Sequence, residues 1–129
     1  MSTGIVVSYK KDGPISFLTF TWEVDQAAIL KDFAEVYRLI GDIKDSALLF
    51  DLSAIGYINS GFIWQVSELY SNVDEAWGRM VIVGNPVIND TFDLVGFKEF
   101  VKITDSQQEG INELKDFLWI KTFDFRFTD

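Results

Sequence analysis

An unbroken apolar run at residues 47–50, which ends at Asp51, constrains the fold of this chain more than any other feature. A strand with apolar residues at consecutive positions is buried on both faces, as the central strands of parallel sheets are. A second such run, residues 80–83, follows a stretch with helical periodicity. Strand, helix and strand in this order are typical of a βαβ unit, so the sequence predicts an α/β fold.

The rest of the chain supplies the other elements of one small domain. Apolar stretches at 5–9 and 15–21 flank the turn-forming sequence KKDGP and predict an antiparallel hairpin, which makes the sheet mixed. Periodicity and helix-stop glycines predict four helices and a last core strand, at residues 25–40, 60–77, 87–95, 106–118 and 100–103. A chain of 129 residues with 48% hydrophobic residues suits a single core, so we expect one domain over residues 1–118.

Residues 119–129 form a C-terminal extension with a different pattern. Phe123, Phe125 and Phe127 alternate with polar residues, which is the period of a strand, so the sequence predicts an extra C-terminal strand. Three phenylalanines on one edge would not stay bare in a soluble monomer. We expect them to pack on the domain, to pair across a homodimer or to receive a partner.

The segment after Asp51 delivers one serine, Ser60, to the start of a helix. A hydroxyl there lies at the positive end of the helix dipole, where backbone N–H groups favour a phosphate. Asn and Ser are also preferred N-cap residues, so Asn59 or Ser60 could simply satisfy the free N–H groups of the first turn. From these residues alone, a cap and a phosphorylation site both stay open.

The motifs around Ser60 resemble those of the STAS domain family, whose simplest members are bacterial anti-sigma factor antagonists. In that family a strand ends in D-L-[ST], and a D-S-[ST]-G-L motif follows whose first serine is phosphorylated by a partner kinase. DLS at 51–53 and YINSGF at 57–62 match without a gap, which places Asn59 on the family aspartate and Ser60 on the phosphorylated serine. The resemblance continues through WEVD, GRMVIVGNP, TFDLVGFKEFVKI and DSQQEGINEL, at residues 22–25, 78–86, 91–103 and 105–114.

The resemblance implies a regulatory protein rather than a catalyst. It implies that the chain binds an anti-sigma factor or serine kinase and is switched by phosphorylation of Ser60, with a serine phosphatase as a further partner. Asn59 departs from the family pattern by removing one negative charge beside the phosphate, and Phe62 and Trp64 stand where glycines are usual. A non-switching STAS module is the alternative, in which the Trp64 face and the Phe-rich tail serve assembly or ligand sensing.

The predicted partner-binding surface lies on one face of the helix at 60–77. Ser60 and Trp64 are four residues apart and share a face, away from the apolar stripe of Phe62, Val66, Leu69 and Val73. The residues predicted to contact the partner are Asn59, Ser60, Gly61, Trp64, Ser67 and Glu68. An exposed Trp is typical of an interface hot spot, but the C-terminal tail could equally cover it.

Three acidic residues are predicted to support this site. Asp51 either steers the loop that follows it or bonds local backbone N–H groups. Glu23 and Asp25 open the first predicted helix, where carboxylates favour the dipole.

Composition excludes several classes of function. A net charge of −9 and a pI near 4.3 argue against nucleic acid and suit a basic groove on another protein. Without His or Cys, the chain lacks the usual neutral-pH base, the thiolate nucleophile and most transition-metal ligands. We therefore expect no enzyme activity, no metal and no cofactor.

The sequence also bears on the compartment. It has no signal-peptide pattern and no apolar stretch of about 20 residues, so we expect neither export nor a membrane span. The absence of Cys is compatible with a reducing compartment. A soluble cytoplasmic protein is the expectation, unless the chain is a domain excised from the membrane-transporter branch of the family.

Overall fold

A five-stranded mixed sheet organises the computed structural model, which describes residues 4–23, 33–58 and 60–127. Its strands, in both chain order and spatial order, are β1 (Gly4–Asp12), β2 (Ile15–Glu23), β3 (Ala47–Asp51), β4 (Arg79–Val83) and β5 (Ile103–Thr104). β1 and β2 form the predicted antiparallel hairpin, and β2 to β5 pair in parallel. The carboxyl ends of the parallel strands therefore meet at one edge of the sheet.

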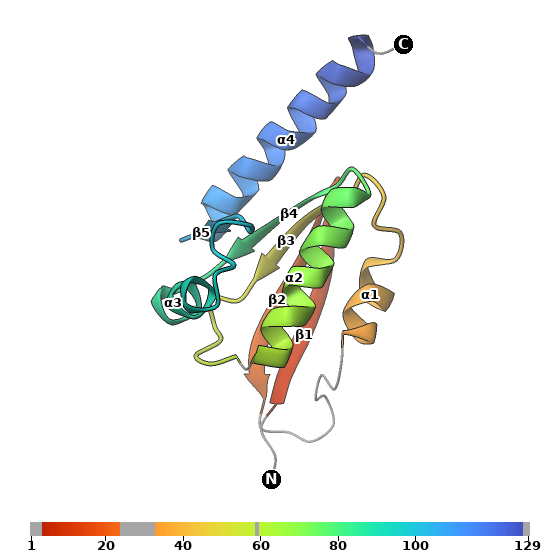
Figure 1. The fold of residues 1–129 in the computed structure, drawn as a ribbon. Coiled ribbons are helices and arrows are strands. Elements are labelled where there is room, and N and C mark those ends of the chain that lie inside the picture. Colours follow the sequence, from red (N-terminus) through yellow and green to blue (C-terminus); the bar gives the residue numbers. More distant parts are fainter. Residues whose placement is uncertain (1–3, 24–32, 59, 128–129) are drawn as a thin grey trace.

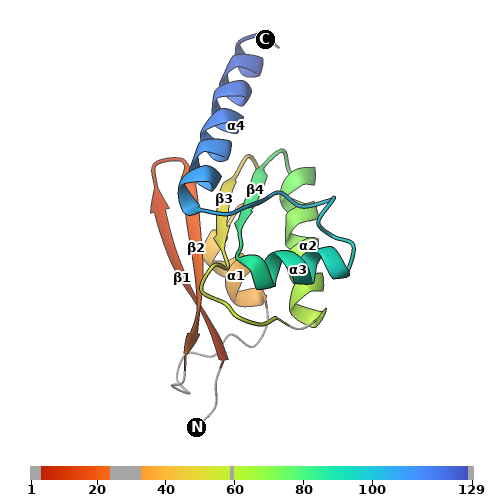
Figure 2. The ribbon, with the colours of Figure 1, turned by 90° about the vertical axis from the view of Figure 1, so that its left-hand side faces the viewer.

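Helices cover both faces of this sheet. They are α1 (Ala34–Ile40), α2 (Ser60–Glu75), α3 (Pro86–Leu94) and α4 (Gln107–Phe127). Figures 1 and 2 show α1, α2 and α3 on one face and α4 on the other. The predicted α/β class, with a mixed sheet and four helices, is confirmed over the described residues. Residues 25–32 of the first predicted helix lie outside them.

The core has two layers because the central strands are buried on both faces. In β3, Leu48 and Phe50 pack toward α2, while Ala47 and Leu49 pack toward α4, and none of the four is more than 1% exposed. Successive side chains of a strand point to opposite faces, so a continuous apolar run serves both layers at once. This burial is what the run at 47–50 predicted.

The core stripe of α2 differs from the predicted one at its first position. Its buried residues are Ile63, Val66, Leu69 and Val73. Phe62 is half-buried instead and lies edge-on to Phe20 and Phe33, with ring centroids 6.0 and 5.4 Å apart. Three of the four predicted stripe positions are therefore core positions, and Phe62 packs at the margin.

The C-terminal extension is helical, so the predicted extra strand is wrong. α4 runs without interruption through residue 118 to Phe127. No Gly or Pro follows Gly110, so the sequence offers no signal that would end the helix before the alternating phenylalanines. Period-two alternation over so few residues did not outweigh the continuation of a helix already anchored on the sheet.

Close packing and a lysine hold α4 in place. A Cβ atom on Gly110 would lie 2.7 Å from Cδ1 of Leu49, so the absent side chain lets the first turn of α4 approach β3. Farther along, Lys121 donates to the backbone oxygen of Trp77 and pairs with Asp45 at 2.5 Å. Both ends of the contact between α4 and the sheet layer are therefore fixed.

The last strand is shorter and later than the predicted span of 100–103. β5 is Ile103–Thr104, which pairs with Ile82 and Val83. Before it, the backbone turns, since the N–H groups of Phe100 and Val101 both donate to the oxygen of Phe97. The turn leaves Phe100 72% exposed while Val101 stays buried.

The turn between α2 and β4 gives a first test of this packing. A Cβ atom on Gly78 would lie 2.7 Å from the backbone oxygen of Ser46, which cannot move without disturbing β3. We expect Gly78→Ala to lower the free energy of unfolding by about 1–3 kcal/mol in urea denaturation. Gly56→Ala is the matched control, because nothing lies within 4 Å of the added atom, and it should stay within about 0.5 kcal/mol of wild type. Equal stability of the two variants would contradict this packing.

The Lys121–Asp45 pair gives a second test, by NMR titration of the Asp45 carboxyl group. The hydrogen bond from Lys121 holds the pKa of Asp45 below its usual value, and the charges of Lys121 and Lys44 act in the same direction. A pKa lowered by folding adds stability above the unfolded pKa, about 3.9, and that stability is lost as pH falls. We expect Lys121→Met to raise the pKa of Asp45 more than Lys44→Met does. An unchanged titration in Lys121→Met would show that α4 is not held by this pair.

Candidate functional site

The loop between β3 and α2 lies at the carboxyl edge of the sheet and is tied down by local hydrogen bonds. Oδ1 of Asp51 accepts from the backbone N–H of Ser53 at 2.9 Å and from its hydroxyl at 2.6 Å. The Leu52 N–H donates to the oxygen of Val83, which joins the loop to the neighbouring strand. Asp51 thus bonds the backbone of its own loop, and it is only 9% exposed.

Asn85, which follows the neighbouring strand β4, holds the same loop. Its side-chain amide nitrogen donates to the backbone oxygens of Ser53 and Ile55, at 3.0 and 2.9 Å. Its Oδ1 accepts from the Ile88 N–H at 2.9 Å and so caps α3, whose first residue is Pro86. One side chain therefore joins the loop before α2 to the start of α3.

Ser60 is the first residue of α2, and it is exposed, as is Gly61. Buried Ile55 and Ile58 hold the loop just before it against the core. The first turn of α2, described in full, contains no acidic residue. A group attached to the Ser60 oxygen would therefore meet the positive end of the helix dipole without a competing carboxylate in that turn. Asn59 lies outside the described residues.

The face of α2 that carries Trp64 is the one opposite its buried stripe. Trp64 is 66% exposed, Glu68 is exposed and Ser67 is half-buried. The Trp64 ring packs edge-on against Phe97, with centroids 5.2 Å apart and planes at 78°. α4 lies on the other side of the sheet (Figure 2), so the described part of the tail does not cover Trp64.

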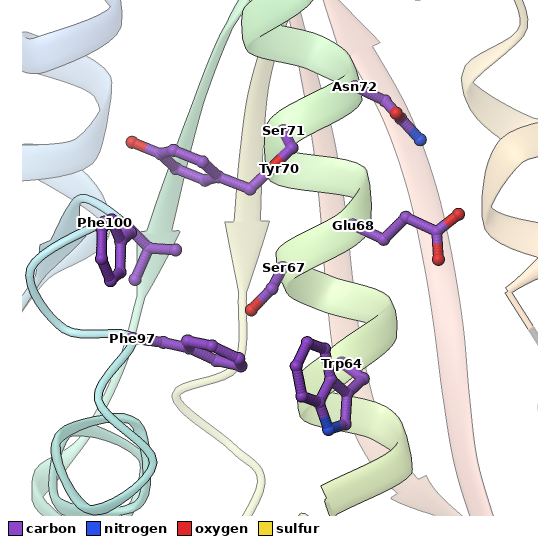
Figure 3. A pocket seen from close by; sticks show the side chains of 9 residues that line it. Trp64, Ser67, Glu68, Tyr70, Ser71, Asn72, Phe97 and Phe100 are labelled. Carbon is purple, nitrogen blue, oxygen red and sulfur yellow. The ribbon is translucent and has the colours of Figure 1, made fainter.

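A groove runs beside this face, between α2 and the turn that precedes β5 (Figure 3). The residues that α2 contributes to it are Trp64, Ser67, Glu68, Tyr70, Ser71 and Asn72. The turn contributes Phe97, Phe100 and Val101. We call it the Trp64 groove; its volume is about 530 Å³. The Tyr70 hydroxyl accepts from the Lys102 N–H at 3.1 Å and so ties the two walls together.

The two acidic residues predicted near the first helix are only partly placed. Glu23 is the last residue of β2 and not a helix residue, while the predicted start of the first helix, at Asp25, lies outside the described residues. Glu23 lies beyond the Thr19–Asp51 pair, toward the same sheet edge as the loop before α2. Asp25 lies outside the described residues, and its role stays a prediction.

Three contributors to the site were not predicted from the sequence. Asn85 was missed, although Asn followed by Pro is a recognisable helix start. Phe100 was assigned to the predicted strand at 100–103 and Phe97 to no element, and no local pattern indicates that Phe97 meets Trp64 across 33 positions of sequence. Within residues 4–23, 33–58 and 60–127, no cluster of three or more His, Cys, Asp or Glu side chains is placed to hold a metal ion. In the same ranges no helix has the length and apolarity of a membrane span.

The chain belongs to the STAS domain family, whose family model matches residues 7–110. The match includes β2 to β5, most of β1 and the loop that leads to Ser60. Among solved structures, the chain is similar to the crystal structure of an anti-sigma factor antagonist from Mycobacterium paratuberculosis. The two share 17% sequence identity with a TM-score of 0.67, over 87% of this chain and 95% of the other, which shows a common fold. No curated protein matches the chain.

The Asn85 hydrogen bonds generate a prediction about the loop before α2. Asn85→Ala removes the α3 cap and leaves two backbone oxygens without their donor, so we expect it to lower the free energy of unfolding by about 1–3 kcal/mol. Asn85→Ser is the matched control, because it keeps a capping oxygen but lacks the amide N–H groups. It should recover α3 stability yet leave amide hydrogen exchange at residues 53–58 as fast as in Asn85→Ala. Wild-type exchange rates in both variants would show that the Asn85 amide does not hold this loop.

Proposed function

We propose that this STAS domain is an anti-sigma factor antagonist, which binds an anti-sigma serine kinase and is released when Ser60 is phosphorylated. The observation that carries the proposal is the exposed position of Ser60 at the first residue of α2, directly after a loop fixed by Asp51 and Asn85. A kinase needs access to the hydroxyl, and a fixed loop presents it in one geometry. The resemblance of YINSGF to the family motif supports Ser60 as the modified serine.

The helix dipole favours the modified state of this chain. A phosphate on Ser60 adds roughly −1.5 to −2 charges at the N-terminal end of α2, the positive end of the helix dipole. The phosphorylated domain should therefore stay folded. The change acts on the surface that the partner meets, not on the core.

The same charge is unfavourable for binding of the partner. The chain carries a net charge of −9, which suits a basic groove, but a partner that accommodates an uncharged hydroxyl at the contact must desolvate the new phosphate or lose the contact. Trp64 lies one helical turn from Ser60 and is 66% exposed, so it supplies an apolar anchor beside the switch. We assign the contact surface to Asn59, Ser60, Gly61, Trp64, Ser67 and Glu68, with a serine phosphatase to restore the hydroxyl.

Phosphorylation assays with an anti-sigma serine kinase from the same organism test the proposal. We expect ATP-dependent phosphate on Ser60 in wild type and none on Ser60→Ala, with Ser71→Ala as a control that removes another exposed hydroxyl of the same helix. Ser60→Asp should bind the kinase at least about tenfold more weakly, a loss of ~1.4 kcal/mol, with little change in stability. If Ser60 is only a capping residue, Ser60→Ala costs about 0.5–2 kcal/mol and binding is unaffected. Wild-type affinity of Ser60→Asp would favour the non-switching alternative.

A further inference from the structure

The Trp64 groove contains a buried polar atom that no described residue satisfies. The Ser67 hydroxyl oxygen is inaccessible to water and has no hydrogen-bond partner among the described residues. In Figure 3 it points from α2 toward the wall that carries Phe97. Burying a hydroxyl without a partner costs free energy, and a group that enters the groove and bonds this oxygen would recover it.

The walls around this oxygen are largely aromatic, and the hydrogen bond from the Lys102 N–H to the Tyr70 hydroxyl joins them. Trp64 and Phe97 meet edge-on at 5.2 Å, and Phe100 is 72% exposed on the far wall. Large aromatic side chains left in water around a concave surface are a common feature of ligand sites. A volume of about 530 Å³ is within the range of pockets that take small molecules. A molecule inserted between the two rings would bury their faces and reach the Ser67 hydroxyl.

The charge of the lining limits the chemistry of the ligand. No Lys or Arg lines the groove, and the chain carries a net charge of −9, so an anion gains nothing there. Glu68, the charged residue of the lining, points away from Phe97 and Phe100 in Figure 3, which leaves the centre of the groove uncharged. Largely aromatic walls whose polar groups, apart from Glu68, are uncharged favour an uncharged molecule.

We propose that the Trp64 groove binds a small uncharged molecule with an aromatic or branched aliphatic body and one hydroxyl or amide group, which bonds Ser67. This site goes beyond the proposed function, since it requires neither the kinase nor phosphorylation of Ser60. Because Trp64 belongs both to the groove and to the proposed partner surface, an occupied groove would change the surface that the partner meets.

NMR titration with 2-phenylethanol tests the site on the full chain. The four tryptophans give four indole N–H signals, and Trp64→Phe identifies the one of interest. We expect saturable shifts of the Trp64 signal. The signals of Trp77 and Trp119 should stay still, because these side chains are each 72% exposed but do not line the groove. Phenylacetate, which has a carboxylate in place of the CH2OH group, should bind more weakly. Equal shifts at all three tryptophans, or none at Trp64, would overturn the proposal.

Ser67→Ala isolates the hydrogen bond. Loss of this hydrogen bond should weaken the binding of 2-phenylethanol roughly fivefold, the equivalent of one neutral hydrogen bond. Propylbenzene has a methyl group in place of the hydroxyl, so its binding should be unchanged. The same substitution should not lower the stability of the free protein, since the oxygen it removes has no partner. Ser8→Ala, which removes an exposed hydroxyl outside the groove, is the matched control. Unchanged binding of 2-phenylethanol to Ser67→Ala would show that Ser67 does not recognise the ligand.

Discussion

Burial of β3 and β4 on both faces is the constraint on which the rest of the structure depends. Each strand places alternate side chains in two core layers, so a helix must cover each face of the sheet. α2 takes one face and α4 the other, and this separation puts Ser60 and the C-terminal helix on opposite sides of the molecule. The proposed switch surface is therefore free of the tail.

The polar groups at the carboxyl ends of these strands turn that layered core into a site. Asp51 and Asn85 follow or end neighbouring strands, and both direct their hydrogen bonds into the loop between β3 and α2. Such bonds satisfy backbone groups that a loop would otherwise have to leave to water. These bonds hold the part of the loop at Ser53 and Ile55, and exposed Ser60 follows as the first residue of α2, which is the geometry on which the proposed switch depends.

The sequence predicted the parts of the fold that depend on strong local patterns. The apolar run at 47–50, the hairpin around KKDGP and the helix that starts at Ser60 all lie where the patterns indicated. The prediction of a C-terminal strand was wrong because the alternation of Phe123, Phe125 and Phe127 competes with a helix that begins at Gln107 and meets no stop signal. β5 was misplaced because its two residues carry too little pattern to define a strand. The contact of Trp64 with Phe97 depends on how the chain returns past α2, and no local signal encodes that path.

Position along α2 separates the two kinds of chemistry that this face offers. Ser60 lies at the N-terminal end of α2, the positive end of the helix dipole, so this position favours an anion more than any later one. One and two turns farther on, at Trp64 and Ser67, the N–H groups are bonded within the helix, and only side chains are presented. There the aromatic walls and the buried Ser67 hydroxyl favour an uncharged apolar molecule. The dipole effect falls off within the first turn, so a phosphate at Ser60 and an uncharged ligand beside Ser67 would occupy distinct electrostatic environments on one helix face.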